Sequence, residues 1–254
     1  MSAVEADRPC AGVARIVIDA PPANALGRAA REDLARELDR IAADLEVRAA
    51  VLTGRGRVFC TGNDLMEAVA RDRAAAAESL EDFSRLFERL ARLRVPVVAA
   101  VNGWCTGGGL ELSLCCDLRI ASDRARFVCA GVNVGLVASA WRLPRLIGLS
   151  RAKQMLLTGS PVTAAEAECF GLVTEVAAPE ALDAAALTLA ERIASRAPLA
   201  AEAAKRCANQ AFELDAEAGA ALFRREAAGL AETEDHAAAL AAFTAKRQPA
   251  FKRR

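Results

Sequence analysis

The feature that most restricts the fold is an alternation of short apolar runs with amphipathic segments. Residues 48–54 (RAAVLTG) and 95–103 (VPVVAAVNG) are apolar runs that end in glycine, a pattern typical of buried strands. Over 30–45 and 79–94, leucine, isoleucine and phenylalanine recur at helical spacing with charged residues between them. Strands that alternate with helices in this way predict an α/β fold.

Weaker signals complete the outline of the chain. We expect a strand at 12–19, and a strand that passes into a helix within 58–69, where Asp64 and Glu67 have capping-box spacing. Further short strands are expected at 116–121, 126–130 and 171–177. Beyond Pro144 the pattern is mainly helical. The stretch 198–246 is predicted as alanine-rich helix whose apolar positions pack on the core or on a neighbouring subunit.

Composition excludes several classes of function. The chain of 254 residues has 33 acidic and 33 basic side chains, and this balance argues against nucleic acid as the main partner. No apolar run reaches the roughly 20 residues of a membrane span, and the N-terminus lacks the apolar core of a signal peptide, so we expect a soluble, cytoplasmic protein. Eight cysteines without a CxxC pair, and a single histidine, His236, predict reduced thiols and no metal site.

The stretch VNGWCTGGGLELSLCCDLRIA (101–121) places three glycines before a helix with one carboxylate, Glu111. Phosphate-binding motifs do not fit, because Gly109-Leu110 replace the Lys-Ser/Thr of a P-loop and Leu112 replaces the last glycine of a dinucleotide fingerprint. A second loop, CTGND (60–64), also leads into a helix start. Two such loops can each direct a free backbone amide at one oxygen and form an oxyanion hole, each donor contributing about 3–4 kcal/mol. Alternatively, both are ordinary strand-to-helix turns.

The segments VLTGRGRVFCTGNDLMEA and PVVAAVNGWCTGGGLELSLCCDLRIAS together resemble the crotonase, or enoyl-CoA hydratase/isomerase, superfamily. PPANAL, APLAAEAAK and EDHAAALAAFTAKRQPAF extend the similarity over nearly the whole chain. The resemblance implies a ββα spiral core over 1–196 and a C-terminal helical region over 197–254 that forms trimers, often as dimers of trimers. It also implies acyl-CoA thioester substrates and no cofactor other than the coenzyme A of the substrate.

Carried onto this chain, the resemblance makes the amides of Asn63 and Gly108 the oxyanion hole and Glu111 the general acid/base. Phe243, Lys246 and Phe251 would reach the CoA nucleotide bound at a neighbouring subunit. The substrate or CoA contacts that it implies are Ala23, Ala25, Leu26, Thr61, Asp64, Leu65, Trp104, Gly131, Phe243, Lys246 and Phe251.

Hydratases of this family use a second glutamate in a segment of the form F-x-x-P-E-x-x-x-G. Here that segment reads FVCAGVNVG (127–135), which places Gly131 at the glutamate position, and the following loop LVASAWRLPRLIG is shorter than usual. The arrangement is locally similar to methylmalonyl-CoA decarboxylase-like members, although the chain has no tyrosine for the following loop. We therefore predict enolate chemistry with one carboxylate: proton transfer or isomerisation, decarboxylation, or a related lyase step.

Three alternatives remain open. The first is an ordinary enoyl-CoA hydratase with an unrecognised second acid, and the second is a catalytically silent homologue. The third is an RNA-binding homologue, because residues 246–254 contain five basic side chains. The default interpretation of that basic run is a solvated chain end.

Several of these residues also have purely structural interpretations. In these interpretations Glu111 forms a buried salt bridge, for instance to Arg119, and Asp64 and Glu67 cap a helix. Asp117 anchors the following strand by an ion pair. In the same way, Cys129 is an inert packed side chain, and Trp104 and Trp141 belong to the core rather than to the acyl pocket. His236 is exposed or lies at a subunit contact.

Overall fold

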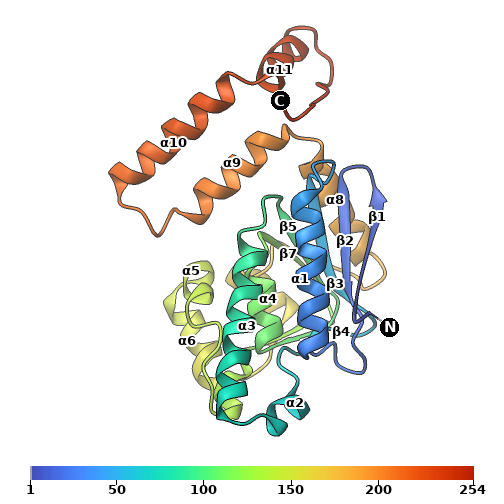
Figure 1. Cartoon of the computed structure of the whole chain (residues 1–254), viewed down its shortest axis with the longest axis vertical. Coiled ribbons are helices and arrows are strands. Elements are labelled where there is room, and N and C mark those ends of the chain that lie inside the picture. Colours follow the sequence, from blue (N-terminus) through green and yellow to red (C-terminus); the bar gives the residue numbers. More distant parts are fainter. Residues whose placement is uncertain (1) are drawn as a thin grey trace.

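The computed structural model describes residues 2–254, which form two sheets enclosed by helices (Figure 1). The larger sheet has the strand order β1-β2-β3-β5-β7-β10, parallel except for β1. The smaller has the order β4-β6-β8-β9, parallel except for β9. The strands are β1 (Val4–Cys10), β2 (Val13–Ile18), β3 (Ala49–Gly54), β4 (Val58–Cys60), β5 (Val97–Val101), β6 (Trp104–Thr106), β7 (Leu118–Ser122), β8 (Arg126–Val128), β9 (Val162–Thr163) and β10 (Glu175–Ala177).

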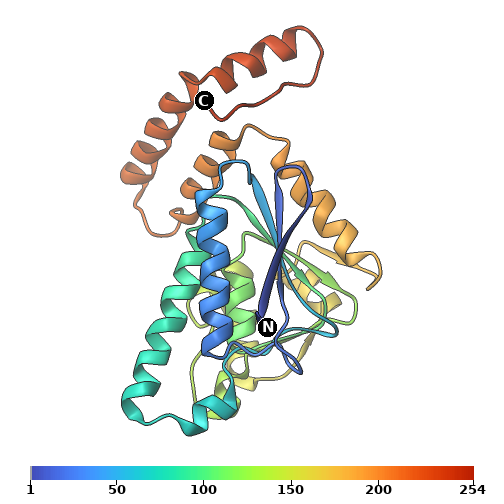
Figure 2. The same cartoon turned by 45° about the vertical axis from the view of Figure 1, so that its right-hand side comes forward.

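The helices lie on both faces of the larger sheet. In Figures 1 and 2, α1 and α3 run side by side over one face, and α8 covers the other. The helices are α1 (Arg28–Ala43), α2 (Leu65–Ala70), α3 (Arg73–Ala91), α4 (Gly108–Leu114), the 3₁₀ helix η1 (Ala130–Val134), α5 (Arg142–Ile147), α6 (Leu149–Thr158), α7 (Ala164–Phe170), α8 (Leu182–Ala194), α9 (Pro198–Asn209), α10 (Ala216–Ala231) and α11 (Glu234–Thr244). None of the helices in this part of the chain is long and apolar enough to cross a bilayer.

Successive strand pairs wind through the two sheets as a spiral. The chain passes from β3 to β4, from β5 to β6 and from β7 to β8. Helices return it to the larger sheet after the first two pairs, and after the third it reaches β9 of the smaller sheet before α7 leads to β10. Close backbone contact makes these passages possible, because a Cβ on Gly54 would lie 2.2 Å from the carbonyl oxygen of Val58, and one on Gly103 1.9 Å from that of Arg57. The predicted α/β fold with a ββα spiral is therefore confirmed.

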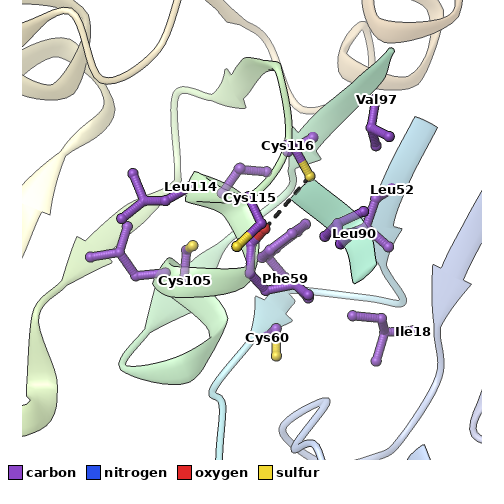
Figure 3. Close-up of a cluster of buried hydrophobic side chains, with 14 of the residues drawn as sticks. Ile18, Leu52, Phe59, Cys60, Leu90, Val97, Cys105, Leu114, Cys115 and Cys116 are labelled. Atoms are coloured by element: carbon purple, nitrogen blue, oxygen red, sulfur yellow. Dashed lines mark hydrogen bonds between the residues drawn. The ribbon is translucent and has the colours of Figure 1, made fainter. Parts of the chain in front are cut away.

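Buried thiols take part in the main core. Figure 3 shows Cys60, Cys105, Cys115 and Cys116 among aliphatic and aromatic side chains such as Phe59. All four are free and buried, as is Cys129. They therefore pack as small apolar residues, as the sequence predicts.

Strand β1 is not anticipated from the sequence. Its residues VEADRPC are largely exposed and polar, and only Val4 is buried. The strand forms because it pairs antiparallel with β2 at the edge of the sheet. An edge strand with polar side chains gives no apolar pattern and resists pairing with other chains.

The prediction of one alanine-rich helical stretch over 198–246 is too simple, because the segment divides into three helices. The side chain of Asp215 accepts a hydrogen bond from the amide of Ala218 and starts α10, and that of Thr233 accepts one from His236 and starts α11. A side-chain cap satisfies an amide that has no partner within the helix, so it favours a new start. α9 and α10 lie against each other, and α11 stands at the end of the molecule (Figure 1).

The chain end is not simply solvated. Residues 252–254 fold back on α11: the carboxylate of Asp235 accepts from the amides of Lys252 and Arg253, and the carbonyl of Arg254 accepts from the Asp235 amide. The guanidinium of Arg253 pairs with Glu202, a buried residue of α9. The pairing neutralises part of the basic run that suggested an RNA-binding tail.

An ion pair fastens α9 to the larger sheet. Lys205 Nζ donates to Asp117 Oδ2 at 2.8 Å and to the carbonyl of Val95 at 3.0 Å. The same Asp117 oxygen accepts from the amide of Val97 at 2.7 Å. Asp117 thus forms an ion pair, as the sequence analysis expected, but it binds α9 and the start of β5 rather than the strand that follows it.

We predict that Lys205→Met lowers the free energy of unfolding by about 3 kcal/mol, because it leaves the Asp117 carboxylate without its cation in a mostly buried position. Urea denaturation followed by circular dichroism measures the change. The matched control is Glu32→Gln, which breaks the exposed Arg28–Glu32 pair and should cost less than about 0.5 kcal/mol. Equal losses in the two variants would contradict this role of Lys205.

Candidate active site

Three parallel strands of the smaller sheet end at one edge, and the segments singled out in the sequence follow them. β4 and β6 pair through Cys60 and Cys105, and β6 and β8 through Thr106 and Val128. Because the carboxyl ends of parallel strands meet at one edge, the loops at 61–64, 107–108 and 129–131 are brought together.

The first two of these loops are in direct backbone contact. A Cβ on Gly62 would lie 2.4 Å from the amide nitrogen of Gly108, and a Cβ on Gly108 would lie 3.6 Å from that of Asn63. Thr106 Oγ1 also donates to the carbonyl of Thr61 at 3.3 Å. Within residues 2–254, neither the Asn63 nor the Gly108 amide donates a hydrogen bond, so two free donors lie on touching loops.

Each glycine of the triplet has its own steric cause. Gly107 has φ 52° and ψ −118°, a backbone conformation that favours glycine. Gly108 lies against Gly62. A Cβ on Gly109 would lie 2.0 Å from the carbonyl oxygen of Cys60, so that position must be glycine for α4 to pack on β4. Together they place the first turn of α4 beside the 60–64 loop.

The segment 23–26 runs parallel to the 60–64 loop. Leu26 N donates to the carbonyl of Gly62 at 2.7 Å, Ala25 forms a β-bridge with Gly62, and Thr61 Oγ1 donates to the carbonyl of Ala23 at 3.0 Å. Four of the residues expected to contact substrate or CoA, Ala23, Ala25, Leu26 and Thr61, are therefore neighbours of the Asn63 amide.

Asp64 is the N-cap of α2. Its Oδ1 accepts from the amides of Met66 (2.9 Å) and Glu67 (3.2 Å). The predicted capping box is half right, because Glu67 does not return to the Asp64 amide but accepts from the amide of Arg28 and from Arg71. Leu65, the first residue of α2, is exposed. These contacts give Asp64 a structural role and leave Leu65 accessible.

Glu111 lies in the first turn of α4, with its side chain 15% exposed. Its Oε1 is 3.4 Å from Arg142 Nε, whereas its Oε2 is buried and has no hydrogen-bond partner among the described residues. The salt bridge to Arg119 is not formed, because that guanidinium donates to the carbonyls of Leu172, Ser113 and Cys116. One oxygen of Glu111 thus faces a cation and the other remains free.

Cys129 directly follows β8, at the same edge of the smaller sheet, but it is not a nucleophile. Burial, and secondarily the charge of Glu111, raise the pKa of its thiol to about 12. Because reactive cysteines have lowered pKa values, the thiol stays neutral and packs as an apolar group.

Gly131 stands where the resemblance places the second glutamate of hydratases, and the neighbouring backbone leaves little room there for a side chain. A Cβ on Gly131 would lie 2.8 Å from the carbonyl oxygen of Leu136 and 3.0 Å from the amide nitrogen of Ala138. Neighbouring Ala130 reaches the glycine triplet, with its Cβ 3.9 Å from the position of a Cβ on Gly107. The third loop therefore borders the site but brings no carboxylate to it.

Other predicted contacts lie elsewhere in the chain. Trp104 starts β6, at the opposite end of the strand from Gly107, and is 46% exposed. Phe243, 85% exposed, and Lys246 belong to the α11 end of the molecule, opposite α2 in Figures 1 and 2. The carbonyl of Phe251 accepts from Arg48. One chain does not bring these C-terminal residues to Glu111.

The surface has two hollows whose lining residues do not suggest a reaction. One, of about 540 Å³, is lined by charged residues that pair with each other, such as Arg15 with Asp183. The other, of about 660 Å³, lies where α1 and α3 meet. Neither includes Glu111 or the two free amides, and the described residues contain no group of three or more His, Cys, Asp or Glu side chains suited to a metal.

Sequence reasoning missed Arg142 and Asn24. The sequence spacing does not connect Arg142 with Glu111. The one signal is that arginines stand in the largely apolar stretch AWRLPRLIG. Asn24 is buried with φ 50°, and its side-chain amide donates to the carbonyls of Arg55 and Val58. Asn24 fixes the 23–26 segment beside the site.

Comparison with known proteins identifies relatives in sequence and in fold. A sequence model of the enoyl-CoA hydratase/isomerase family matches residues 8–254. The chain is 38% identical to 2,3-dehydroadipyl-CoA hydratase of Escherichia coli (strain K12) over 91% of each chain. It is also 38% identical to (E)-benzylidenesuccinyl-CoA hydratase of Thauera aromatica, over 94% of this chain and 95% of the relative.

The structure superposes on the crystal structure of enoyl-CoA hydratase from Bacillus anthracis with a TM-score of 0.96 and 33% identity, covering 99% of this chain and all of the other. Sequence and fold agree over nearly the full length. The chain therefore belongs to the enoyl-CoA hydratase/isomerase family, within the crotonase superfamily, whose members act on acyl-CoA thioesters.

Proposed function

We propose that the protein is an acyl-CoA lyase or isomerase that stabilises a thioester enolate and moves protons with Glu111 alone. The observation that carries the proposal is the closed position of Gly131, where a side chain would meet the backbone of 136–138. Without a second carboxylate at that position, the site lacks one of the two acids that hydration uses in the family hydratases.

In the proposed mechanism, the thioester carbonyl oxygen accepts hydrogen bonds from the amides of Asn63 and Gly108. These donors stabilise the negative charge that develops on that oxygen, by about 3–4 kcal/mol each. Glu111 removes the proton from the α-carbon. Return of the proton to another carbon gives isomerisation.

The same site supports decarboxylation of a substrate with an α-carboxylate. The bond from the α-carbon to the carboxylate breaks, its electron pair enters the enolate, and carbon dioxide leaves. Glu111 enters this reaction protonated, with a proton taken from solvent, and supplies that proton to the α-carbon. The two reactions share one enolate and one carboxylate, so they require the same residues.

Hydration is the second candidate, because the two relatives with 38% identity are both named hydratases. Addition of water to an enoyl-CoA requires a positioned water and a proton for the α-carbon. Glu88 is the further carboxylate connected to Glu111, and it is connected only through Arg142. Hydration would therefore have to proceed with Glu111 as its main acid/base group.

For substrate binding, we propose that the segments 23–26 and 61–65 contact coenzyme A, which arrives as part of the substrate and is the only coenzyme required. Phe243, Lys246 and Phe251 would complete a neighbouring subunit's site in a homotrimer or a dimer of trimers. Helix α10 supports an oligomer, because within one chain none of its residues is buried and Phe223 is exposed. The cytoplasmic location expected from the sequence remains a prediction.

The central prediction concerns proton exchange. Incubated in D₂O with saturated acyl-CoA thioesters, the protein should incorporate deuterium at the α-carbon, detected by mass spectrometry. Glu111→Gln should lower the exchange rate by about 10²- to 10⁴-fold, because it removes the general base. Hydration of crotonyl-CoA at a rate equal to or above that of exchange would show that the single-carboxylate proposal is wrong.

A second prediction tests the contact between the two loops. Gly62→Ala places a methyl group against the Gly108 amide and should lower turnover by about 10²- to 10³-fold, the loss expected for one oxyanion donor. Gly56→Ala is the matched control, because Gly56 has a similar φ (76° against 83°) but no atom within 4 Å of a Cβ. If Gly62→Ala turns over as fast as Gly56→Ala, the amides are not the oxyanion hole.

A third prediction concerns assembly. Light scattering should give three or six times the mass of the 26.7 kDa chain. A Phe243→Ala/Lys246→Ala variant should bind acyl-CoA more weakly. Co-expressed with Glu111→Gln, it should form mixed oligomers in which some sites combine an intact Glu111 with an intact C-terminal segment, and these should regain tight-binding activity. A fully active monomer would rule out a shared site.

A further inference from the structure

The two proposed oxyanion donors are held by different kinds of structure. The peptide unit that carries the Gly108 amide continues directly into α4, because its carbonyl accepts from the amide of Glu111 at 3.1 Å. The peptide unit that carries the Asn63 amide lies in a loop. Its carbonyl, that of Gly62, accepts from the amide of Leu26 at 2.7 Å. Gly62 has φ 83°, and glycine restricts the turning of a peptide unit less than any other residue does.

The side chain of Asn63 is bound by Arg71, the residue that directly follows α2. Arg71 Nη1 donates to Asn63 Oδ1 at 3.0 Å, and its Nη2 donates to Glu67 Oε2 at 2.8 Å. Both oxygens of Glu67 also accept from the amide of Arg28, at the start of α1. Only 13% of the Arg71 side chain is exposed. One guanidinium thus connects the 60–64 loop with α2 and, through Glu67, with α1.

Beyond Gly62, little packing holds the chain. Asn63 leads through the cap residue Asp64 into α2, none of whose six residues is buried. The three large apolar side chains of α2 are between 57% and 86% exposed. Apolar burial therefore does not fix the position of Asn63 from this side, and the hydrogen bond from Arg71 does.

We infer that Arg71 is a positioning residue: by binding the Asn63 side chain, it keeps the Asn63 amide directed at the substrate oxygen. A peptide unit is planar, so the contact of Leu26 with its carbonyl and that of Arg71 with the following side chain together set the direction of the N–H. The inference rests on the proposed function, in which this amide is an oxyanion donor. It adds a role for the side chain at position 63, which a main-chain donor does not itself require.

A purely structural contact is distinguished from a positioning contact by the bound thioester. Donors in an oxyanion hole polarise the thioester carbonyl, which lowers its infrared stretching frequency, and they act most strongly in the transition state. A contact that only stabilised α2 would change the free energy of unfolding and leave that frequency unchanged. We therefore choose the carbonyl frequency of bound butyryl-CoA, labelled with ¹³C at the carbonyl, as the first measurement.

The second measurement is α-proton exchange of butyryl-CoA in D₂O, resolved into kcat and KM. Both are made on full-length Asn63→Ala, Arg71→Gln, the double variant and Arg71→Lys. Asn63→Ala keeps the amide and removes only the acceptor for the guanidinium. The matched control is Arg73→Gln, because Arg73 is an exposed arginine two positions farther along, at the start of α3.

Asn63→Ala and Arg71→Gln should each lower kcat about 10-fold and raise the carbonyl frequency towards its value in water, because the donor is misdirected. KM should change less than about twofold, since the lost interaction belongs mainly to the transition state. The double variant should lose no more than either single variant, because both break the same contact. Arg71→Lys should recover part of the loss, since lysine lacks the planar fork, and Arg73→Gln should change nothing.

If the wild type lowers the carbonyl frequency while Asn63→Ala and Arg71→Gln leave frequency and kcat unchanged, the inference is wrong and the oxyanion hole stands. Losses that multiply in the double variant would also reject it. A wild-type frequency equal to that in water would reject the proposed function, and the inference with it. Should Arg71→Gln not fold, Asn63→Ala measured against Arg73→Gln decides in the same way.

Discussion

The contact of Gly62 with Gly108 is the constraint on which the site depends. Two backbones approach so closely that a single Cβ at position 62 would overlap the Gly108 amide. This approach sets the first turn of α4, and with it Glu111, beside the 60–64 loop. Because both free amides belong to loops fixed by parallel strands, they need no rearrangement when charge develops on a substrate oxygen, which is the condition for strong electrostatic stabilisation.

The same edge of the sheet carries the proposed difference in chemistry. The first two loops hold the two free amides, while Gly131 in the third loop packs against 136–138 and brings no carboxylate. Two relatives named as hydratases are 38% identical in sequence, and the solved enoyl-CoA hydratase from Bacillus anthracis superposes with a TM-score of 0.96. In the proposed function, the fold and the two donors are therefore independent of the number of acids, and the number of acids limits the reaction.

Local patterns account for what could be predicted. The buried strands at 49–54 and 97–101 were visible because they are apolar runs, and the oxyanion loops were visible as paired motifs. β1 was hidden because an exposed edge strand has no apolar period, and the breaks before α10 and α11 because the caps at Asp215 and Thr233 prevail over alanine propensity. The Glu111–Arg142 pair joins elements 31 positions apart, and only the folded chain brings them together.

The C-terminal helices show where a single chain is incomplete. Arg253 and Arg94 both pair with buried Glu202, and Lys205 pairs with Asp117, so α9 and the chain end are fastened to the core. α10, by contrast, has no buried residue, and Phe223, Leu240 and Phe243 on α10 and α11 are exposed. Large apolar side chains on firmly held helices favour burial against another surface. The carboxylate proposed for proton transfer thus lies within one chain, whereas the apolar side chains of α10 and α11 are left uncovered by it.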